Sequence, residues 1–307
     1  MGLLYAGLAA GGLGGLPSGL AGSLSRAYAR QLAHNHLVLA EMRRVLQALD
    51  GVDVMVAKGL ALAAIYYGDP GIRPTADIDL IIRYADFERV AAALAGLGYS
   101  PRADYQEKLE LYCHVTFERE GAAGVPVEAH WSLGRDFPSN PDDAALWQGA
   151  QTADIREVSV QTLSTENHLL HAALHLAHHT VFGGYPSLLW LADVALLSRQ
   201  QGVCWDAVGS SAAEQGFARA AYLSLALSER LLDGQFPVEV RRQLAPLAGA
   251  VPALVDRGLA DRLVFGGVPA PVRQMLAASF QGAASKRGRY LAKHWVKPAL
   301  KAVGLKR

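Results

Sequence analysis

Cysteine is scarce in this sequence, which has only Cys113 and Cys204 among its 307 residues. The two cysteines stand far apart and match neither a zinc-binding spacing nor a disulfide framework. Low cysteine content of this kind is typical of a reducing compartment. We therefore expect a cytoplasmic protein.

The sequence also lacks an excess of positive or negative charge. The chain has 29 Lys and Arg against 28 Asp and Glu, a formal net charge of +1, so no overall field attracts nucleic acid or anionic lipid. Apolar residues make up 51% of the chain and charged residues 19%, which indicates a folded protein with a sizeable core rather than a disordered one. A chain of this length has room for two domains.

Charged residues are missing altogether between positions 2 and 25, and the first basic residue is Arg26. A signal peptide carries positive charge before its apolar stretch, so this start does not fit one. Pro17 and frequent glycines also interrupt the run of about 20 apolar residues that a membrane-spanning helix needs. We expect no transmembrane segment and predict a helical lead-in over residues 1–50.

The apolar periodicity changes near residue 160. Before it, helical patterns alternate with strand patterns, and strands are predicted over 52–57, 78–82, 111–119 and 125–131. Helices are predicted over 24–48, 60–67, 85–97, and, after the change, near 165–182, 186–200, 205–215, 217–233, 237–246 and 250–262. We predict an α+β domain over residues 51–160, a helical domain over 161–285 and a basic tail over 286–307.

Two carboxylates open one of the predicted strands. Asp77 and Asp79 precede an apolar run that ends at Ile82, and residues i and i+2 of a strand point to the same face. Side-by-side carboxylates repel each other unless a cation lies between them, and hard divalent ions such as Mg²⁺ take oxygen ligands. An isolated Asp-x-Asp is often a solvated strand end, but the apolar strand that follows favours a site at the end of a sheet.

A second strand carries Glu128 and His130, again two residues apart and so on one face. A third carboxylate borne on a strand is what a site for two metal ions needs. The alternative for Glu128 is a lone acid on a strand. His130 fits either a catalytic role or a histidine that is hydrogen-bonded within the sheet.

Lys58 and Gly59 lie between a short predicted strand and a helix. Backbone N–H groups at a helix start, together with the lysine charge, favour a bound anion such as phosphate. An ordinary strand–helix turn is the alternative. Arg73 fits two roles equally, neutralising a leaving group or forming a structural salt bridge with a site acid.

These motifs together resemble a known family. The run Lys58-Gly59, Tyr67, Arg73, Asp77-Ile78-Asp79, Gly98-Tyr99 and Glu128-Ala129-His130-Trp131 is similar to the uncharacterised bacterial nucleotidyltransferases of the DNA-polymerase-β-like superfamily, over residues 30–200. The resemblance implies a small mixed β-sheet with flanking helices, followed by a helical domain. It also implies that Asp77 and Asp79 hold Mg²⁺, with two ions expected, and that Glu128 is the third carboxylate.

The sequence departs from the superfamily pattern at two positions. Gly59 is followed by Leu60, where a Gly-Ser or Gly-Gly pair is frequent, and the third carboxylate is Glu128 rather than an aspartate. The first departure removes a hydroxyl from the expected phosphate loop. The second makes the metal ligand one methylene longer.

Histidines at positions 168, 171, 175, 178 and 179 have the spacing of one helix face. Such a stripe can bind metal, contact phosphate or shuttle protons, or it can pack its imidazoles between helices. The resemblance extends to His175, His179, Trp190 and Asp193, so we expect this helix beside the catalytic cleft. Neither HExxH nor CxxC is present, which disfavours a zinc site.

The last residues form a basic tail. From Lys286 onward there are eight Lys or Arg residues and no acid. A solvated end is the simpler interpretation, and a patch for nucleic acid or anionic lipid is the alternative.

The sequence thus predicts Mg²⁺-dependent transfer of a nucleotidyl group from a nucleoside triphosphate such as ATP to an unknown small-molecule, peptide or protein acceptor. Asp77, Asp79 and Glu128 would be catalytic and metal-binding. The nucleotide would be contacted by Lys58, Gly59, Arg73, His130, His175 and His179. A non-catalytic module that binds nucleotide or serves as a scaffold is the alternative, favoured by Leu60 where a hydroxyl is expected.

Overall fold

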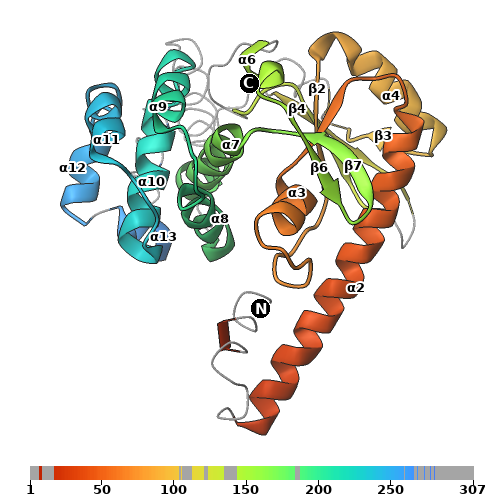
Figure 1. The fold of residues 1–307 in the computed structure, drawn as a ribbon, viewed down its shortest axis with the longest axis horizontal. Helices are drawn as coiled ribbons and strands as arrows, with labels where there is room; N and C mark the ends of the chain where they lie inside the picture. Colours follow the sequence, from red (N-terminus) through yellow and green to blue (C-terminus); the bar gives the residue numbers. More distant parts are fainter. Residues whose placement is uncertain are drawn as a thin grey trace, which may run out of the picture. The chain divides into compact units, whose positions relative to one another are not determined.

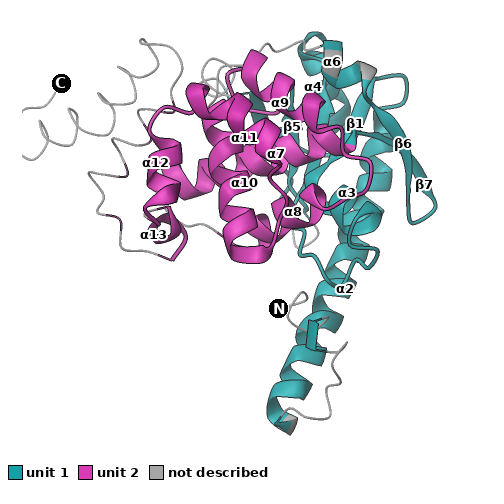
Figure 2. Cartoon of the chain, turned by 60° about the vertical axis from the view of Figure 1, so that its left-hand side comes forward, with its two compact units in different colours: residues 1–132, 141–164 teal, residues 133–140, 165–307 magenta. Residues whose placement is uncertain are grey.

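The computed structural model describes residues 7–8, 17–103, 105, 113–120, 124–134, 144–183, 187–258, 260–265, 268, 273, 277 and 280. The basic tail over 286–307 lies outside the described residues. The chain divides into two compact units, which are residues 1–132 with 141–164 and residues 133–140 with 165–307 (Figure 2).

The first unit is built on a seven-stranded sheet in the order β3-β4-β5-β2-β1-β7-β6 (Figure 1). Its strands are β1 (Val54–Ala57), β2 (Ile78–Ile82), β3 (Ser100–Pro101), β4 (His114–Glu118), β5 (Val127–His130), β6 (Gln151–Ile155) and β7 (Val158–Thr162). The pairs β1–β7 and β2–β5 are parallel and the other neighbours antiparallel. The sheet is therefore mixed, as expected, but larger than the small sheet that the resemblance implied.

The hairpin of β6 and β7 accounts for part of the added size. Its two turn residues, Arg156 and Glu157, have φ of 48° and 68°, the left-handed conformation that two-residue hairpin turns require. Asn-Gly is the usual signal for this turn, and Arg-Glu gives none, so the sequence did not reveal the hairpin. The hairpin joins the sheet beside β1, where the Thr162 hydroxyl donates to the Val56 carbonyl over 2.6 Å.

Two helices cover one face of this sheet (Figure 1). Helix α2 (Ser18–Ala48) and helix α4 (Phe87–Gly96) contribute Val38, Met42, Val45, Val90 and Leu94 to a core that includes Ile78, Leu80, Ile82, Val127 and Ala129. These strand residues alternate with Asp79, Ile81, Glu128 and His130 along the chain, and successive strand side chains point to opposite faces. The core face is thus apolar, and the opposite face carries the chemistry.

A buried polar network ties α2 to this sheet. Glu41 of α2 is 7% exposed. Its carboxylate forms ion pairs with Arg44, at 2.9 Å between Nη1 and Oε2, and with Arg119, at 3.1 Å between Nη1 and Oε1. The Tyr99 hydroxyl lies 3.0 Å from Glu41 Oε1 and 2.8 Å from the Val125 carbonyl. Because a buried carboxylate without partners is costly, these contacts hold α2 in one position.

The second unit is helical in its described residues from Thr165 to Phe265. Its helices are α7 (Thr165–His178), the π-helical segment η3 (His179–Gly183), α8 (Leu188–Ser198), α9 (Trp205–Glu214), α10 (Ala218–Leu232), α11 (Val238–Leu244), η4 (Ala245–Leu247), α12 (Val251–Asp256) and α13 (Asp261–Phe265). Helix α10 packs against α7 and α8, and its Ser224 hydroxyl donates to the Ala173 carbonyl over 2.6 Å.

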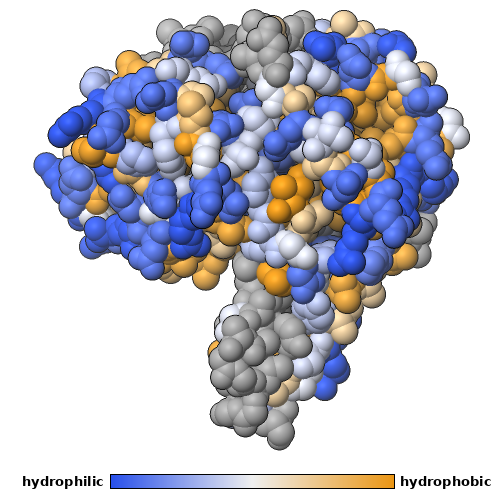
Figure 3. Space-filling model, viewed as in Figure 1, coloured by the Kyte–Doolittle hydropathy of each residue, from blue (hydrophilic) through white to orange (hydrophobic). Residues whose placement is uncertain are grey.

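Among the described helices, none combines the length and apolar character needed to cross a membrane. Polar residues predominate on the surface in the view of Figure 3.

Replacing Tyr99 with phenylalanine tests the network around Glu41. Burial, followed by the Glu41 contact, raises the pKa of Tyr99 to about 12, above the value of about 10 in an unfolded chain. The stabilisation that this implies is complete below pH 10 and is lost as the pH rises toward 12. We expect Tyr99→Phe to lower the free energy of unfolding by about 1 kcal/mol at pH 8. Between pH 10 and 12, the variant should lose less stability than the wild-type protein, because it has no phenol to ionise.

Urea unfolding at pH 8 and at pH 11 measures both effects. Tyr84→Phe is the control, because Tyr84 is 43% exposed. Equal behaviour of the two variants would contradict the role given to the Tyr99 hydroxyl.

Candidate functional site

Three neighbouring strands present polar side chains on the face opposite the core. Parallel pairing sets Asp79 of β2 beside Glu128 of β5. The next pair along the two strands, Leu80 and Ala129, belongs to the core face. On the other side of β5, Thr116 of β4 pairs with Glu128. The pairing register therefore brings two carboxylates from segments about fifty positions apart into adjacent places.

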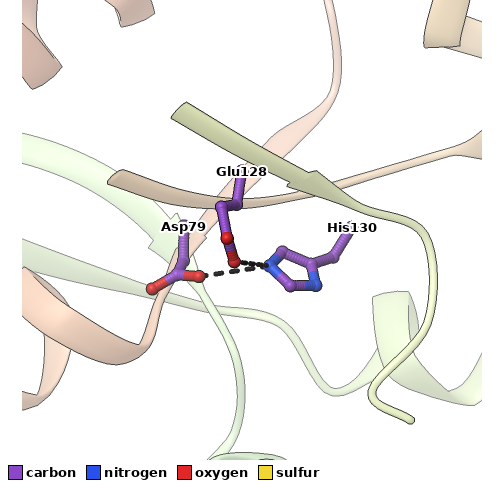
Figure 4. Close-up of side chains that lie close together, drawn as sticks. All are labelled: Asp79, Glu128 and His130. Carbon is purple, nitrogen blue, oxygen red and sulfur yellow. Dashed lines mark hydrogen bonds and ion pairs between the residues drawn. The ribbon is translucent and has the colours of Figure 1, made fainter. Parts of the chain in front are cut away.

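Asp79, Glu128 and His130 form a close group (Figure 4). His130 Nε2 lies 3.1 Å from Asp79 Oδ1 and 3.2 Å from Glu128 Oε2. One potential ligand atom from each residue lies within 4.8 Å of the others. Asp79 and His130 are buried, at 3% and 4% exposed, and Glu128 is partly buried. Such a group can hold a divalent ion through two oxygens and one nitrogen.

Lys58 directs its ammonium into this group. Its Nζ lies 2.5 Å from Asp79 Oδ1, 3.4 Å from His130 Nε2 and 3.7 Å from Glu128 Oε2. The residue opens helix α3 (Lys58–Ile65) with φ of 43°, a left-handed conformation that costs a residue other than glycine roughly 1–3 kcal/mol. The short helix thus begins in an unfavourable conformation that points the charge at the carboxylates.

The charges in this group stabilise one another. Burial by itself lowers the pKa of Lys58, but Asp79, Glu128 and Asp77 outweigh it and raise that pKa above its ordinary value. Burial raises the pKa of Glu128, whereas the His130 hydrogen bond and the Lys58 charge bring it well below the usual range. Lys58 is therefore an ammonium and Glu128 a carboxylate at neutral pH.

Asp77 is the remaining carboxylate of the predicted site. It lies at a bend just before β2 and is half-buried, so it is not on the strand that bears Asp79. Burial and the Asp79 charge raise the pKa of Asp77 to about 7, which indicates that the two carboxylates interact. In the described residues, however, the close group contains His130 and not Asp77. Asp79 and Glu128 thus come together, and Asp77 stands next to them.

Gly59 is required because the Thr75 side chain closely approaches its backbone. A Cβ at this position would lie 2.6 Å from Thr75 Cγ2 and 3.5 Å from the Asp77 carbonyl oxygen. Arg73 Nη1 donates to the carbonyls of Gly59 and Pro74, both over 3.2 Å. These two hydrogen bonds of Arg73 hold the segment before β2 against the start of α3.

The histidine helix belongs to the second unit. The His179 ring stacks on Trp190 of α8 with centroids 4.1 Å apart, and His175 lies 4.5 Å from His179 and 4.8 Å from Trp190. His168, His171 and His179 are buried, and His175 and His178 are partly buried. The imidazoles of His175 and His179 therefore contact an aromatic ring within their own unit. That His175 and His179 line the carboxylate site stays a prediction.

Two neighbours of the close group were not identified from the sequence. Thr116 Oγ1 donates to Glu128 Oε1 over 3.3 Å, and the His114 ring stacks on His130 with centroids 5.1 Å apart. Both lie on β4, a strand that the sequence did predict. The alternation of His114, Val115 and Thr116 shows that the two share a face, but only the register shows which strand they meet.

The fold and the site together define a protein that can hold a divalent ion between carboxylates of adjacent strands. The sequence model of a family described as uncharacterised nucleotidyltransferase matches residues 1–233, and the chain belongs to this family. The match includes the whole sheet, and it is consistent with the polymerase-β-like resemblance of the motifs. No curated protein matches the chain.

Replacing Gly59 with alanine tests the close approach at the site. The new Cβ would meet Thr75, a β-branched residue that is 4% exposed and has little freedom to move aside. We expect Gly59→Ala to lower the free energy of unfolding by roughly 1–3 kcal/mol. Urea unfolding measures the change.

Gly96→Ala is the matched control. Gly96 ends helix α4, and nothing lies within 4 Å of the Cβ it would gain. This substitution should leave stability unchanged or raise it by up to about 1 kcal/mol. If both variants unfold at the same urea concentration, the close approach at Gly59 is not a constraint.

Proposed function

We propose that this protein transfers a nucleotidyl group from a nucleoside triphosphate to an acceptor, in a reaction that depends on a divalent metal ion. One observation carries the proposal. The carboxylates of Asp79, which is buried, and Glu128, which is partly buried, come from two parallel neighbouring strands and lie together with an ammonium directed at them. Membership of a nucleotidyltransferase family supports the class of reaction.

The donor set fits a divalent ion, because two carboxylates and one imidazole lie within reach of a common point. Asp79 and Glu128 would hold the ion, with Asp77 beside them to bind a second one. A bound ion would neutralise negative charge on the phosphates during transfer. The resemblance implies two ions and implies Mg²⁺ as their identity, and the experiment below supplies either Mg²⁺ or Mn²⁺.

The transfer itself exchanges one bond to phosphorus for another. An acceptor oxygen forms a bond to the α-phosphorus, the bond from that phosphorus to the bridging oxygen breaks, and pyrophosphate leaves. The proton of the acceptor passes to a site carboxylate and from there to solvent. The role of Glu128 would be to orient the acceptor and take up this proton. The Thr116 hydroxyl, which donates to Glu128 Oε1, would hold the carboxylate in place.

The phosphates are held by Lys58 and the start of α3. Lys58 is paired with Asp79 in this structure, and it turns to the phosphates once a divalent ion neutralises the carboxylates. The Thr75 hydroxyl is buried beside Gly59 and has no hydrogen-bond partner in the described part of the chain. It takes the place of the hydroxyl that Leu60 lacks. His130, Arg73, His175 and His179 remain proposed contacts of the nucleotide.

ATP is the nucleoside triphosphate that we propose as the donor, and the acceptor is a small molecule, a peptide or a protein. The low cysteine content favours a cytoplasmic reaction. A second function has its own support: Lys58 already neutralises Asp79, as it would in a site that works without metal. A module that binds nucleotide without transferring it is therefore the alternative.

Incubation with each of the four nucleoside triphosphates, labelled at the α-phosphorus, together with Mg²⁺ or Mn²⁺ and a cell lysate tests the transfer. We expect covalent labelling of an acceptor by the wild-type protein. Asp79→Asn and Glu128→Gln should each reduce it by at least about 100-fold, because each removes a carboxylate charge from the site.

Glu118→Gln is the control, since Glu118 lies exposed on β4. Binding of a triphosphate without labelling would favour the non-catalytic module. Full labelling by Asp79→Asn would overturn the proposed site.

Lys58→Ala tests how the phosphates are held. Lys58 would meet only phosphate charge, so we expect triphosphate binding to weaken by about 10-fold or more, while binding of the nucleoside stays unchanged. Calorimetric titration with each ligand measures this. Because loss of the ammonium leaves two buried carboxylates less well compensated, a thermal melt must first show that the variant is folded. Equal weakening for both ligands would give Lys58 a structural role only.

A further inference from the structure

We propose that His130 is a metal ligand and that the site prefers a divalent transition ion, such as Mn²⁺ or Zn²⁺, to Mg²⁺. The inference rests on the proposed function, because it concerns the ion at the same carboxylates. It departs from the all-oxygen set of Asp77, Asp79 and Glu128 that the sequence suggested.

The composition of the close group carries the inference. Its members are one imidazole and two carboxylates, and His130 Nε2 is nearly equidistant from Asp79 Oδ1 and Glu128 Oε2, at 3.1 Å and 3.2 Å. Mg²⁺ strongly favours oxygen ligands and keeps several waters. Imidazole nitrogen is instead a ligand of the divalent transition ions, and three side chains with open positions beside them are typical of catalytic sites for such ions.

The backbone keeps the imidazole in this position. His130 shares a face with Glu128 on β5, and the parallel register places it opposite Ile81, two residues beyond Asp79. Its ring is 4% exposed and stacks on that of His114, at an interplanar angle of 20°. An ion that enters between Asp79 and Glu128 therefore meets His130 Nε2 without a large movement of the ring. By contrast, Asp77 lies at a bend outside the strand.

A cation already occupies the point at which the three side chains converge. Lys58 Nζ lies within 3.7 Å of an atom of each of them. Its ammonium thus stands in for the charge that an ion would bring, and a divalent ion takes its place. Removing this ammonium without removing the ligands should leave more room for the ion.

Metal binding to the full-length protein, without nucleotide, tests the inference. Calorimetric titrations with Mn²⁺, Zn²⁺ and Mg²⁺ give the three affinities, and electron spin-echo envelope modulation of bound Mn²⁺ detects a directly coordinated nitrogen. We expect a nitrogen coupling in the wild-type protein. His130→Gln, which offers an amide oxygen instead, should abolish the coupling and weaken Mn²⁺ and Zn²⁺ by at least about 10-fold, with a smaller effect on Mg²⁺.

His114→Gln is the matched control, because the His114 ring is stacked on that of His130 but lies outside the close group. It should retain the nitrogen coupling. Lys58→Met should bind Mn²⁺ at least as tightly as the wild-type protein, since a competing charge is gone. If His130→Gln fails to fold, the spectrum of the wild-type protein still decides the question.

Absence of nitrogen coupling from bound Mn²⁺ in the wild-type protein would overturn the inference and leave an all-oxygen site. Loss of the coupling in His114→Gln but not in His130→Gln would overturn it as well. These outcomes are separate from the failure of the proposed function. A protein that binds Mn²⁺ through nitrogen but labels no acceptor would keep the inference and lose the transfer, and one that transfers with no such coupling would do the reverse.

Discussion

The ion pair between Lys58 and Asp79 is the interaction on which the first unit depends. Asp79 lies on the central strand β2, all of whose residues are buried, and a carboxylate in that position is strongly unfavourable unless positive charge compensates it. Lys58 directly follows β1, whose last residue, Ala57, pairs with Asp79, and it supplies that charge at 2.5 Å. The left-handed start of α3 and the missing side chain at Gly59 both serve to bring it there.

The surrounding structure supports this pair from both directions. On the core face, α2 and α4 pack against Ile78, Leu80 and Ile82 and so hold β2 in its register. Ahead of the first residue of β2, Asn35 of α2 donates to the carbonyls of Pro70 and Arg73, over 2.6 Å and 2.8 Å. The segment that leads into Asp77 and Asp79 is therefore tied to the same helix that covers the sheet. A helix on the core face of the sheet thereby helps to position the groups on the opposite face.

The same electrostatics link stability to function. A buried cluster of two carboxylates, one ammonium and one imidazole is a poor way to stabilise a fold, because apolar side chains of similar volume often do as well or better. Its retention is understandable if its charges are used, and a divalent ion with a triphosphate would use all of them. In that account Lys58 has two partners in turn, first the carboxylates and then the phosphates. His130 lies at the centre of the exchange, because its Nε2 faces both carboxylates and the ammonium.

The strands β2 and β5 and the change to helices after residue 160 were predictable from the sequence, because apolar periodicity depends on neighbours a few positions apart. Periodicity also showed that Glu128 and His130 share a face, and the motif spacing indicated the family that the sequence match then established. The hairpin of β6 and β7 was not predictable, because the left-handed turn falls on Arg156 and Glu157, which give no local signal.

The composition of the site was decided only in three dimensions. Asp79 and Glu128 meet because of the parallel register between β2 and β5, which depends on the packing of the whole sheet and on no local pattern. Asp77 belongs to the same short motif but lies at a bend one residue before the strand begins, and it is not a member of the close group. The sequence by itself therefore indicated which residues are candidates for the chemistry, and it placed Glu128 and His130 together on one strand. Tertiary structure decided that His130 and Lys58 join Asp79 and Glu128, because long-range pairing sets the distances between side chains.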